Sequence, residues 1–599
     1  MSTTGNNAPV LPAGASEPGE SAHSDLVRQL LAEALPRSGP GPGSSLGRAP
    51  SPAPSASVPA APTAPAIPAE AASVPGLANL SAVENHSPVP PVHPSTQPAA
   101  PELAEPEKTP SAASTPSGGH SPDNGESYAF GEPRCNGSYR PQNNRPDTKV
   151  ANRHPLPGFS EAESASPDYY FLSGAQPAGK SPLACQSYPK TATPIPKFDV
   201  EGVRRDFPAL HQTVNGRPLV WLDNAATTHK PQAVLDATAQ FYGRDNSNIH
   251  RAAHTLAARS TELFEAGREK VRKFLGAADA KEIIFVRGTT EAINLVAQSY
   301  GRKNIGAGDE IIVTELEHHA NIVPWQLLAE QVGATVRVIP INNRGELILE
   351  EYVKLLNART KLVSVAHVSN SLGTINPVEQ IIALAHARGV PVLVDGAQST
   401  PHLPVNVAAL NADFYAFSGH KIFGPTGIGA LYGKAALLEA MPPWQGGGHM
   451  IKDVRFEKTV FQHAPEKFEA GTPDIAGVVG LGAAIDYLFK VGIPAIAAYE
   501  HALLEYATHA LSAIPGLRPI GTATNKASVL SFVIPGVANE SIARQLDKQG
   551  IAVRAGHHCA QPAIRHFGLE TSVRPSLAFY NTREEIDELV RALHSLKRS

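Results

Sequence analysis

Short apolar runs alternate with amphipathic stretches from about residue 200 to the end of the chain. The runs typical of buried strands are residues 283–286, 311–313, 362–368 and 414–417. After the first run, Ile293, Leu295 and Val296 follow the spacing of an amphipathic helix. This alternation of strands and helices predicts an α/β protein with a sizeable core and room for two domains.

The first 195 residues follow a different pattern, rich in proline, alanine and serine. More than half of the 55 prolines fall before residue 200, whereas all three tryptophans come later, at Trp221, Trp325 and Trp444. A segment with so few bulky apolar side chains cannot bury enough surface to offset the entropy lost on ordering. We expect residues 1–195 to form a largely disordered arm.

Two parts of this arm carry apolar side chains. Residues 24–36 place Leu26, Val27, Leu30, Leu31, Ala34 and Leu35 on one helical face, with Ser24 or Asp25 as N-cap and Pro36 beyond the end. So short a helix is marginal alone and is expected to fold in the groove of a partner. A second region holds scattered aromatic residues: Tyr128, Phe130, Tyr139, Phe159, Tyr169, Tyr170 and Phe171. The alternative is a tolerated tail without any partner.

Charge and composition narrow the classes of function. The net charge is -4 and no run of basic residues occurs, which argues against a nucleic-acid partner. The sequence shows neither a membrane-spanning apolar stretch nor a signal-peptide pattern, so we expect no membrane association. Three cysteines, Cys135, Cys185 and Cys559, do not form a disulfide framework in so long a chain, which favours the cytosol.

A metal centre is not expected from the sequence. His250 and His254 have the spacing of ligands on a helix, but no glutamate of the zincin kind accompanies them.

The most informative chemistry lies in two segments that each follow an apolar run. Asp395 ends the first run, and the second continues into Ser418-Gly419-His420-Lys421. A lysine and an aspartate in this arrangement are how a protein holds pyridoxal 5'-phosphate: the lysine forms an imine, and the aspartate keeps the ring nitrogen protonated. We interpret Lys421 as the cofactor lysine, because it is set among small and apolar residues.

The phosphate of such a cofactor needs its own donors. Gly288-Thr289-Thr290 opens the predicted helix, and free amides at a helix N-terminus bind phosphate, with the Thr290 hydroxyl as a further donor. A simple helix cap without ligand is the alternative. Ser418 and His420 are placed to reach the same phosphate from beside Lys421.

Other polar residues near strand ends are candidates for the cofactor ring and the substrate. One histidine of the pair His318-His319 could stack on the ring and exchange protons, while the other fits a structural role. Gln398 is a candidate for the ring hydroxyl. Asn370, after the strand at 362–368, is a candidate for contact with both cofactor and substrate.

Near the C-terminus, a cysteine lies in a turn rich in glycine and histidine, residues 554–560. His557, His558 and Arg554 would favour the thiolate form of Cys559, which is the nucleophilic form. Arg574 is a candidate for binding the carboxylate of a substrate through two hydrogen bonds. A cofactor lysine, a thiol and a carboxylate-binding arginine together predict chemistry on an amino acid, with the thiol receiving part of it.

With these motifs, residues from about 197 to the end resemble a type II cysteine desulfurase, the SufS-like branch of the class V aminotransferase family. The motifs that carry the resemblance are residues 222–226, 250–251, 288–294, 317–325, 395–398, 418–429, 444–448, 469–473 and 554–559. The resemblance implies a homodimer in which Gly446 and Thr472 reach the phosphate bound by the other subunit, with His250 and Arg251 near the interface. The short loop around Cys559 is the type II form.

The reaction implied by the resemblance converts L-cysteine to L-alanine. Arg574 and Asn370 would hold the substrate carboxylate, with Arg554 nearby, and Lys421 would remove the Cα proton. His318 would accept or relay the thiol proton, and Cys559 would take the sulfur as a persulfide. A selenocysteine lyase is the nearest alternative, and a true transaminase would have no use for the Cys559 loop.

A desulfurase domain with a long Pro/Ala/Ser-rich arm also resembles the cargo enzymes of family 2 encapsulin nanocompartments. That resemblance implies that residues 1–195 direct the enzyme into a protein shell, where sulfur is stored. One alternative is that the arm docks a sulfur acceptor of the SufE or SufU kind. Another is a scaffold with an inactive core, which the intact set of Lys421, Asp395, His318 and Cys559 argues against.

The fold implied by the resemblance is the aspartate-aminotransferase type, fold type I. We expect a large domain at 196–487, with a mostly parallel seven-stranded sheet that binds pyridoxal phosphate at its strand ends. A smaller α/β domain at 488–599 would carry the cysteine loop, and residues 1–195 would be the arm.

Overall fold

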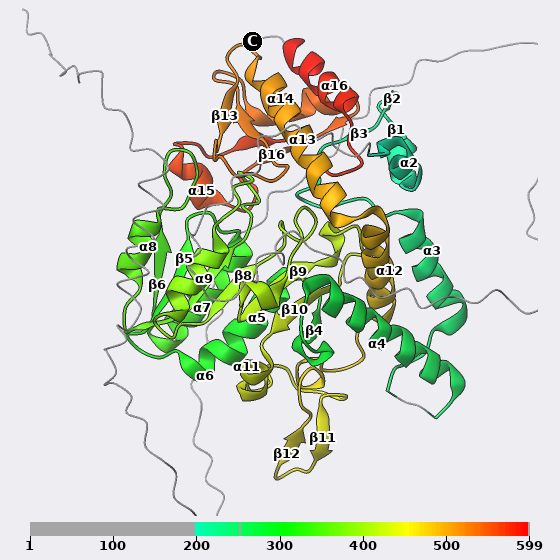
Figure 1. The fold of residues 1–599 in the computed structure, drawn as a ribbon, viewed down its shortest axis with the longest axis vertical. Helices are drawn as coiled ribbons and strands as arrows, with labels where there is room; N and C mark the ends of the chain where they lie inside the picture. Colours follow the sequence, from blue (N-terminus) through cyan, green and yellow to red (C-terminus); the bar gives the residue numbers. More distant parts are fainter. Residues whose placement is uncertain (1–197, 251–252, 597–599) are drawn as a thin grey trace, which may run out of the picture. The chain divides into compact units, whose positions relative to one another are not determined.

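The computed structural model describes residues 198–250 and 253–596 (Figure 1). The expectations for the arm at 1–195, including the helix at 24–36 and the aromatic contacts, lie outside the described residues, as does Arg251.

A seven-stranded sheet forms the centre of the large domain. Its strand order is β4-β10-β9-β8-β7-β5-β6, and β10 is antiparallel to both of its neighbours while the other pairs are parallel. The strands are β4 (Ile283–Val286), β5 (Glu310–Thr314), β6 (Thr335–Ile339), β7 (Thr360–Ala366), β8 (Val392–Asp395), β9 (Phe414–Ser418) and β10 (Gly429–Gly433). The expected mostly parallel seven-stranded sheet is therefore confirmed.

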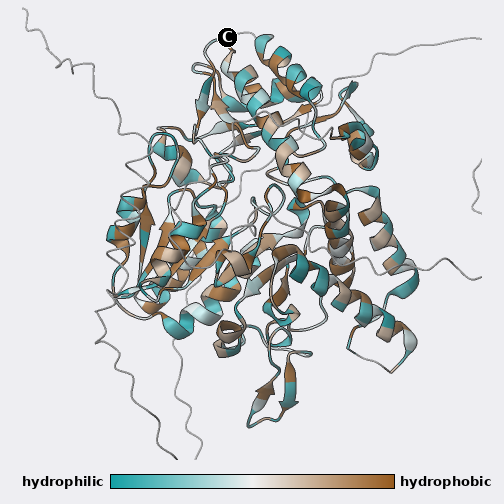
Figure 2. Ribbon diagram, in the orientation of Figure 1, coloured by the Kyte–Doolittle hydropathy of each residue, from teal (hydrophilic) through white to brown (hydrophobic). Residues whose placement is uncertain are grey.

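The apolar runs of these strands are continuous because the sheet is buried on both faces. In β9, Tyr415 and Phe417 pack into one core cluster, whereas Phe414 and Ala416 pack into another on the opposite face. The first cluster is completed by α4 (Thr255–Leu275), α9 (Val378–His386) and α12 (Ile475–Val491), and the second by α5 (Thr289–Val296) and α7 (Val323–Val332). Figure 2 shows the strands of this sheet as hydrophobic and the outer helices as mixed.

A second, four-stranded antiparallel sheet lies in the C-terminal part, with strand order β13-β14-β17-β16. Its strands are β13 (Arg518–Ile520), β14 (Ser531–Val533), β16 (Arg554–Gly556) and β17 (Ser572–Arg574). The helices α13 (Ile493–Ser512), α14 (Asn539–Asp547) and α16 (Arg583–His594) share a third core cluster with this sheet. The short strand β15 (Ile551–Ala552) pairs in parallel with β3 (Val220–Trp221), which ties the start of the described chain to its end.

The remaining elements are short. They are α2 (Val200–Arg205), α3 (Gln232–Gln240), α6 (Arg302–Asn304), α8 (Leu349–Leu355), α10 (Val407–Leu410), α11 (Ala435–Ala440), α15 (Gln561–His566), β1 (Thr213–Val214), β2 (Arg217–Pro218), β11 (Ile451–Val454) and β12 (Thr459–Phe461). The hairpin of β11 and β12 projects from the large domain, next to α11 in Figure 1.

Within residues 198–250 and 253–596, no single helix is long and apolar enough to cross a bilayer. Only the bent pair of α12 and α13, taken together, has the length and composition that a membrane crossing needs. In the same residues, no group of three or more His, Cys, Asp or Glu side chains is arranged to hold a metal ion.

The predicted strand ends agree with the structure at β4 and differ at β7. The sequence predicts a strand over 362–368, but β7 ends at Ala366. Beyond it Ser369 donates its backbone N–H to Thr374, and Gly373 has a φ of 80°, so the chain turns back on itself. Asn370 therefore lies in a turn beyond the strand end, where it can face the carboxyl edge of the sheet.

Candidate active site

A cavity of about 190 Å³ lies where β7, β8 and β9 end, the edge at which open α/β sheets bind ligands. It is lined by residues 225–226, 289–290, 318, 320, 366, 368, 370, 395, 397–398, 418, 420–421, 554, 558–559 and 574. The sequence-predicted site residues found there are Lys421, Asp395, Gln398, His318, Thr290, Ser418, His420, Asn370, Arg554, Cys559 and Arg574. Gly446 and Thr472 are exposed and do not line the cavity within this chain.

Of the lysine and aspartate that line the cavity, Asp395 is buried and Lys421 is half-buried. Burial lowers the pKa of Lys421 to about 8, against the opposing effect of the Asp395 carboxylate. Burial also raises the pKa of Asp395, although the Ala397 amide at 2.9 Å and Lys421 counteract this effect. A lysine whose pKa is lowered in this way loses its proton readily, which suits it to form an imine.

The start of α5 is shaped by the neighbouring strand. The φ of Gly288 is 152°, and a Cβ there would meet Ser418 Oγ at 3.0 Å, so glycine allows the helix to approach β9. Ser418 Oγ accepts the Thr289 amide at 2.9 Å and also contacts the Thr289 hydroxyl at 2.9 Å. Ser418 thus holds the helix start in place, while the exposed Thr290 faces the cavity beyond it.

The two adjacent histidines have separate tasks. His318 Nδ1 accepts the amide of Ala320 at 3.0 Å, so this nitrogen carries no proton. Burial together with Lys421 lowers the pKa of His318 to about 3, so the ring is neutral with its proton on Nε2. His319 instead donates its backbone N–H to the Cys559 carbonyl at 2.8 Å and supports the cysteine loop.

The cysteine is held on a strained turn. His558 and Cys559 have φ values of 55° and 54°, a left-handed conformation that costs about 1–3 kcal/mol for each such residue. The loop is held by the Cys559 amide, which donates to His557 Nδ1 at 3.0 Å, and by the His558 carbonyl, which accepts Asn370 Nδ2 at 2.6 Å. Strain of this kind concentrates at functional sites because it fixes the direction of a reactive side chain.

His558, beside Cys559, does not supply the positive charge that the sequence suggested. Its Nε2 contacts the Ser572 hydroxyl at 2.9 Å, and burial lowers the pKa of His558 to about 3. His557 Nδ1 accepts the Cys559 amide. Lys421 and Arg574 are cations that interact electrostatically with Cys559.

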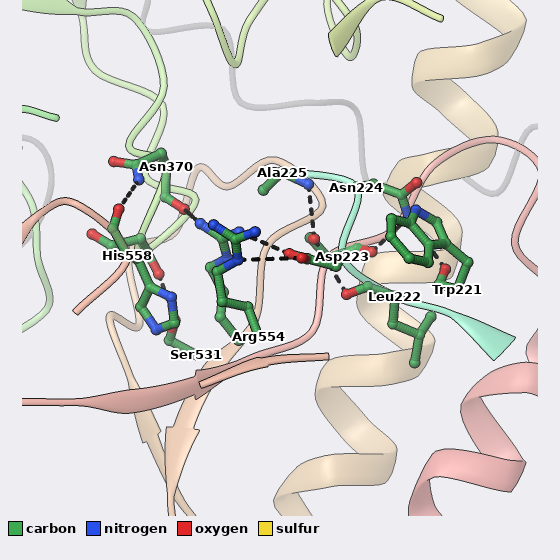
Figure 3. Close-up of polar contacts among 12 residues, drawn as sticks. Trp221, Leu222, Asp223, Asn224, Ala225, Asn370, Ser531, Arg554 and His558 are labelled. Carbon is green, nitrogen blue, oxygen red and sulfur yellow. Dashed lines mark hydrogen bonds and ion pairs between the residues drawn. The ribbon is translucent and has the colours of Figure 1, made fainter. Parts of the chain in front are cut away.

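An aspartate without a predicted role joins the two arginines of the site (Figure 3). Asp223 Oδ1 accepts Arg574 Nη2 at 3.1 Å, and Oδ2 accepts Arg554 Nε at 3.2 Å. Arg574 Nη1 also donates to the Asn370 carbonyl at 2.9 Å. No local pattern in the sequence indicates this contact, because Asp223 lies 331 residues before Arg554 in the chain.

A second unforeseen residue is Glu317, which is fully buried under His318. Its carboxylate accepts the Thr314 hydroxyl at 2.7 Å, the Ala366 amide at 2.9 Å and Asn321 Nδ2 at 2.6 Å. Glu317 therefore joins the ends of β5 and β7 directly beneath the cavity and holds the segment that presents His318.

The residues of the cavity fit pyridoxal phosphate. The Asp395 carboxylate accepts only the Ala397 amide among the described residues, which leaves one carboxylate oxygen for a protonated ring nitrogen. Asn370 Oδ1 and Arg574 Nε are buried and have no hydrogen-bond partner in the described part of the chain. Such groups require a ligand or water, and the buried amine of Lys421 completes the set. Gln398, proposed for the ring hydroxyl, donates here to the Ala225 carbonyl at 2.7 Å.

We predict that His367, which is hydrogen-bonded to the backbone of Asp395, makes the fold sensitive to acid. Burial lowers the pKa of His367 to about 4, and its backbone N–H donates to the Asp395 carbonyl at 2.9 Å. Below about pH 6.5 His367 binds a proton in the unfolded chain but not in the folded chain. The free energy of unfolding therefore falls as the pH drops toward 4. The fall in Tm between about pH 7 and about pH 5 should be smaller in His367→Asn by roughly 2 °C or more.

Thermal unfolding at the two pH values measures this effect. The control is His463→Asn, which changes an exposed histidine and should leave the pH dependence as in the wild type. An equal fall in Tm for His367→Asn and wild type would contradict the prediction.

Comparison with known proteins places these residues in a family. Residues 220–589 match the family described as Aminotransferase class-V. A cysteine desulfurase from Synechococcus elongatus is 62% identical over 400 residues, which are 67% of this chain and 64% of that protein. A probable cysteine desulfurase from Vibrio cholerae is 52% identical over 397 residues, 66% of this chain and 98% of that protein.

Solved structures agree with this placement. The Escherichia coli cysteine desulfurase CsdA, in an S-sulfonic acid form, has a TM-score of 0.62 and 44% identity, over 66% of this chain and 97% of that one. The apo cysteine desulfurase of Thermococcus onnurineus NA1 has a TM-score of 0.63 and 38% identity, over 66% of this chain and 97% of that one. These likenesses confirm the expected fold type I.

The match leaves part of some relatives uncovered: this chain spans 64% of the Synechococcus elongatus protein and 61% of a probable cysteine desulfurase from Mycolicibacterium paratuberculosis. The family match itself covers more than half of the chain, including the cofactor cavity and both sheets. The chain therefore belongs to the class V aminotransferases and is a pyridoxal-phosphate-dependent enzyme.

Proposed function

We propose that the protein is a cysteine desulfurase of the type II, SufS-like kind, which converts L-cysteine to L-alanine and takes the sulfur onto Cys559. The observation that carries this proposal is a cysteine on a strained turn in the same cavity as Lys421 and the buried Arg574. An aminotransferase would need the lysine and the arginine but not the thiol. The relatives described as cysteine desulfurases support the same reading.

Several residues of the cavity would hold the cofactor. Lys421 would bind it covalently, Asp395 would bind its ring nitrogen, and His318 and Gln398 would contact the ring. Thr290, Ser418 and His420 would bind the phosphate, and Gly446 and Thr472 of a second copy of the chain would complete that site in a homodimer. Pyridoxal phosphate, when bound, accepts electrons from the reacting carbon atoms of an amino acid.

The substrate is bound through its carboxylate. Arg574 Nε is buried and unpartnered among the described residues, and Asn370 is anchored beside it by the His558 carbonyl. A carboxylate held there would direct the amino group and the Cα proton toward Lys421, whose Nζ would take this proton and return it to Cα after the carbon–sulfur bond has broken. Because burial lowers the pKa of Lys421 to about 8, its amine can act as a base near neutral pH.

The sulfur moves by attack of the Cys559 thiolate. The Cys559 Sγ bonds to the substrate sulfur as the carbon–sulfur bond breaks, and the electron pair of that bond goes to the carbon. The substrate thiol loses one proton, and the methyl group of alanine gains one, so the protons balance. His318 lines the cavity and can relay this proton. Cys559 is left as a persulfide, and the thiol of an acceptor can then remove the outer sulfur.

The test is a product balance. Holoenzyme mixed with L-cysteine and a reducing thiol should release alanine and sulfide in equal amounts. Pyruvate, or a keto acid formed with consumption of the amino group, would refute the desulfurase assignment and favour another reaction of the family. L-selenocysteine in parallel measures the nearest alternative, since a selenocysteine lyase would turn over selenocysteine and leave cysteine unreacted.

We further propose that residues 1–195 direct the enzyme into an encapsulin shell in the cytoplasm. The support is the Pro/Ala/Ser-rich composition of this segment joined to a desulfurase domain. Residues 1–195 fused to a fluorescent protein should co-purify from the native cell with closed shells seen by electron microscopy. Fluorescence confined to the small soluble fraction would refute the cargo role and favour docking of a sulfur acceptor in the manner of a SufS-like enzyme that supplies iron–sulfur cluster assembly.

A further inference from the structure

We propose that Asp223 sets the charge selectivity of the substrate site, so that it accepts amino acids with one carboxylate and rejects those with two. This inference deepens the proposed function and rests on it for the identity of the substrate. The hydrogen bonds of the Asp223 carboxylate go to Arg554 and Arg574, not to Lys421 or Cys559. Asp223 therefore acts through the two arginines that it joins (Figure 3).

The sheet brings the two arginines together. Arg554 on β16 lies directly opposite Arg574 on β17 in an antiparallel register. Like charges in such a cross-strand pair repel each other, so the pair needs a counter-ion. Asp223 provides it with one carboxylate oxygen for each guanidinium group.

The backbone holds Asp223 in register with these strands. Ser576 donates its N–H to the Leu222 carbonyl at 2.8 Å, and its hydroxyl accepts the Ala225 amide at 2.9 Å. The aspartate is therefore anchored on both sides, and its side chain is only 14% exposed. A carboxylate fixed in this way cannot swing aside when a substrate enters.

The hydrogen bonds of Arg574 leave few of its N–H groups free to bind a ligand. Nη1 is bonded to the Asn370 carbonyl and Nη2 to Asp223, whereas Nε is buried without a partner in the described residues. Arg574 itself is almost fully buried, while Arg554 is about half exposed at the cavity rim. One carboxylate can therefore be satisfied at the inner arginine.

The charges of the site also match a substrate with one carboxylate. Two arginines and one aspartate leave one net positive charge, and burial keeps the pKa of His318 and His558 at about 3, so both rings are neutral. A second carboxylate on the substrate would meet Asp223 without a free cation to balance it.

Binding of L-aspartate and L-alanine to the holoenzyme tests this proposal, because the two ligands differ by one carboxylate. Both affinities are measured by calorimetry and by the absorbance change of the bound cofactor. In Asp223→Asn, which keeps the shape and a hydrogen-bond acceptor, the preference should shift toward L-aspartate by about tenfold. Asp223→Glu should keep the wild-type preference. Asp486→Asn should keep it too, because it removes an exposed charge of α12 that is bonded to Lys270 of α4.

A purely structural counter-ion would give a different result: Asp223→Asn would weaken both ligands equally or lower Tm with an unchanged ratio, and this would overturn the proposal. If Asp223→Asn does not fold, Arg554→Gln gives the opposite test, since it removes a positive charge and should shift the preference away from L-aspartate by about tenfold. An unchanged ratio in Arg554→Gln would also overturn it. These binding ratios are independent of sulfur transfer, so failure to release alanine from L-cysteine refutes only the proposed function.

Discussion

Cys559→Ser should lose alanine formation from L-cysteine by at least about a thousandfold while it keeps the absorbance spectrum of the bound cofactor. The hydroxyl of serine is a far weaker nucleophile toward sulfur than the thiolate of cysteine. The cofactor residues Lys421 and Asp395 are untouched, so binding of the cofactor is unaffected. Alanine released over time, together with the absorbance spectrum, measures both effects in one preparation.

The other two cysteines of the sequence provide the matched control. Cys135→Ser and Cys185→Ser change the same chemical group in residues 1–195, outside the part of the sequence that resembles a desulfurase, and should leave the rate unchanged. Turnover of L-cysteine by Cys559→Ser at the wild-type rate would exclude the persulfide role. Selenocysteine should be affected less than cysteine, because its carbon–selenium bond is weaker and can break without attack by the thiolate.

Lys421→Ala should lose activity by at least about ten-thousandfold, because the cofactor loses its covalent link and the substrate loses its base. After reduction with borohydride, the mass of the wild-type chain should increase by one reduced cofactor, whereas the variant should show no such increase. The buried carboxylate of Asp395 would then lose the nearby charge of Lys421, so we also expect a lower Tm without cofactor.

Lys526, a second lysine whose pKa is lowered, gives a stringent control. Burial lowers the pKa of Lys526 to about 8, the same value as for Lys421, but its Nζ donates to the Gly521 carbonyl at 2.6 Å and it does not line the cavity. Lys526→Met should keep both the covalent cofactor and the activity. Loss of the covalent cofactor in Lys526→Met rather than in Lys421→Ala would show that the cavity lysine is not the reactive one.

Much of the central sheet and the cofactor lysine could be predicted from the sequence because they depend on local patterns. The run at 283–286 became β4 with those bounds, since strands buried on both faces require continuous apolar residues. The Lys421 and Asp395 motifs each follow directly on a strand, so their meeting at one sheet edge follows from parallel topology.

The rest depends on contacts between residues far apart in the chain. Asp223 meets its arginines through the pairing of β3 with β15 and of β16 with β17, which no local pattern indicates. The burial of the His558 ring, which depends on the packing of the whole fold, keeps this histidine neutral, against the expectation that it would support the thiolate. The roles of Gly446 and Thr472 stay predictions, because they concern a second copy of the chain.

The most direct test of the proposed sulfur transfer is the mass of the peptide that contains Cys559, after holoenzyme is mixed briefly with L-cysteine without a reducing thiol. We predict that this peptide gains one sulfur atom while about one alanine is released per chain, as the attack of one thiolate on one substrate requires. Alanine released with Cys559 unmodified, or no alanine at all from a cofactor-loaded enzyme, would contradict the account.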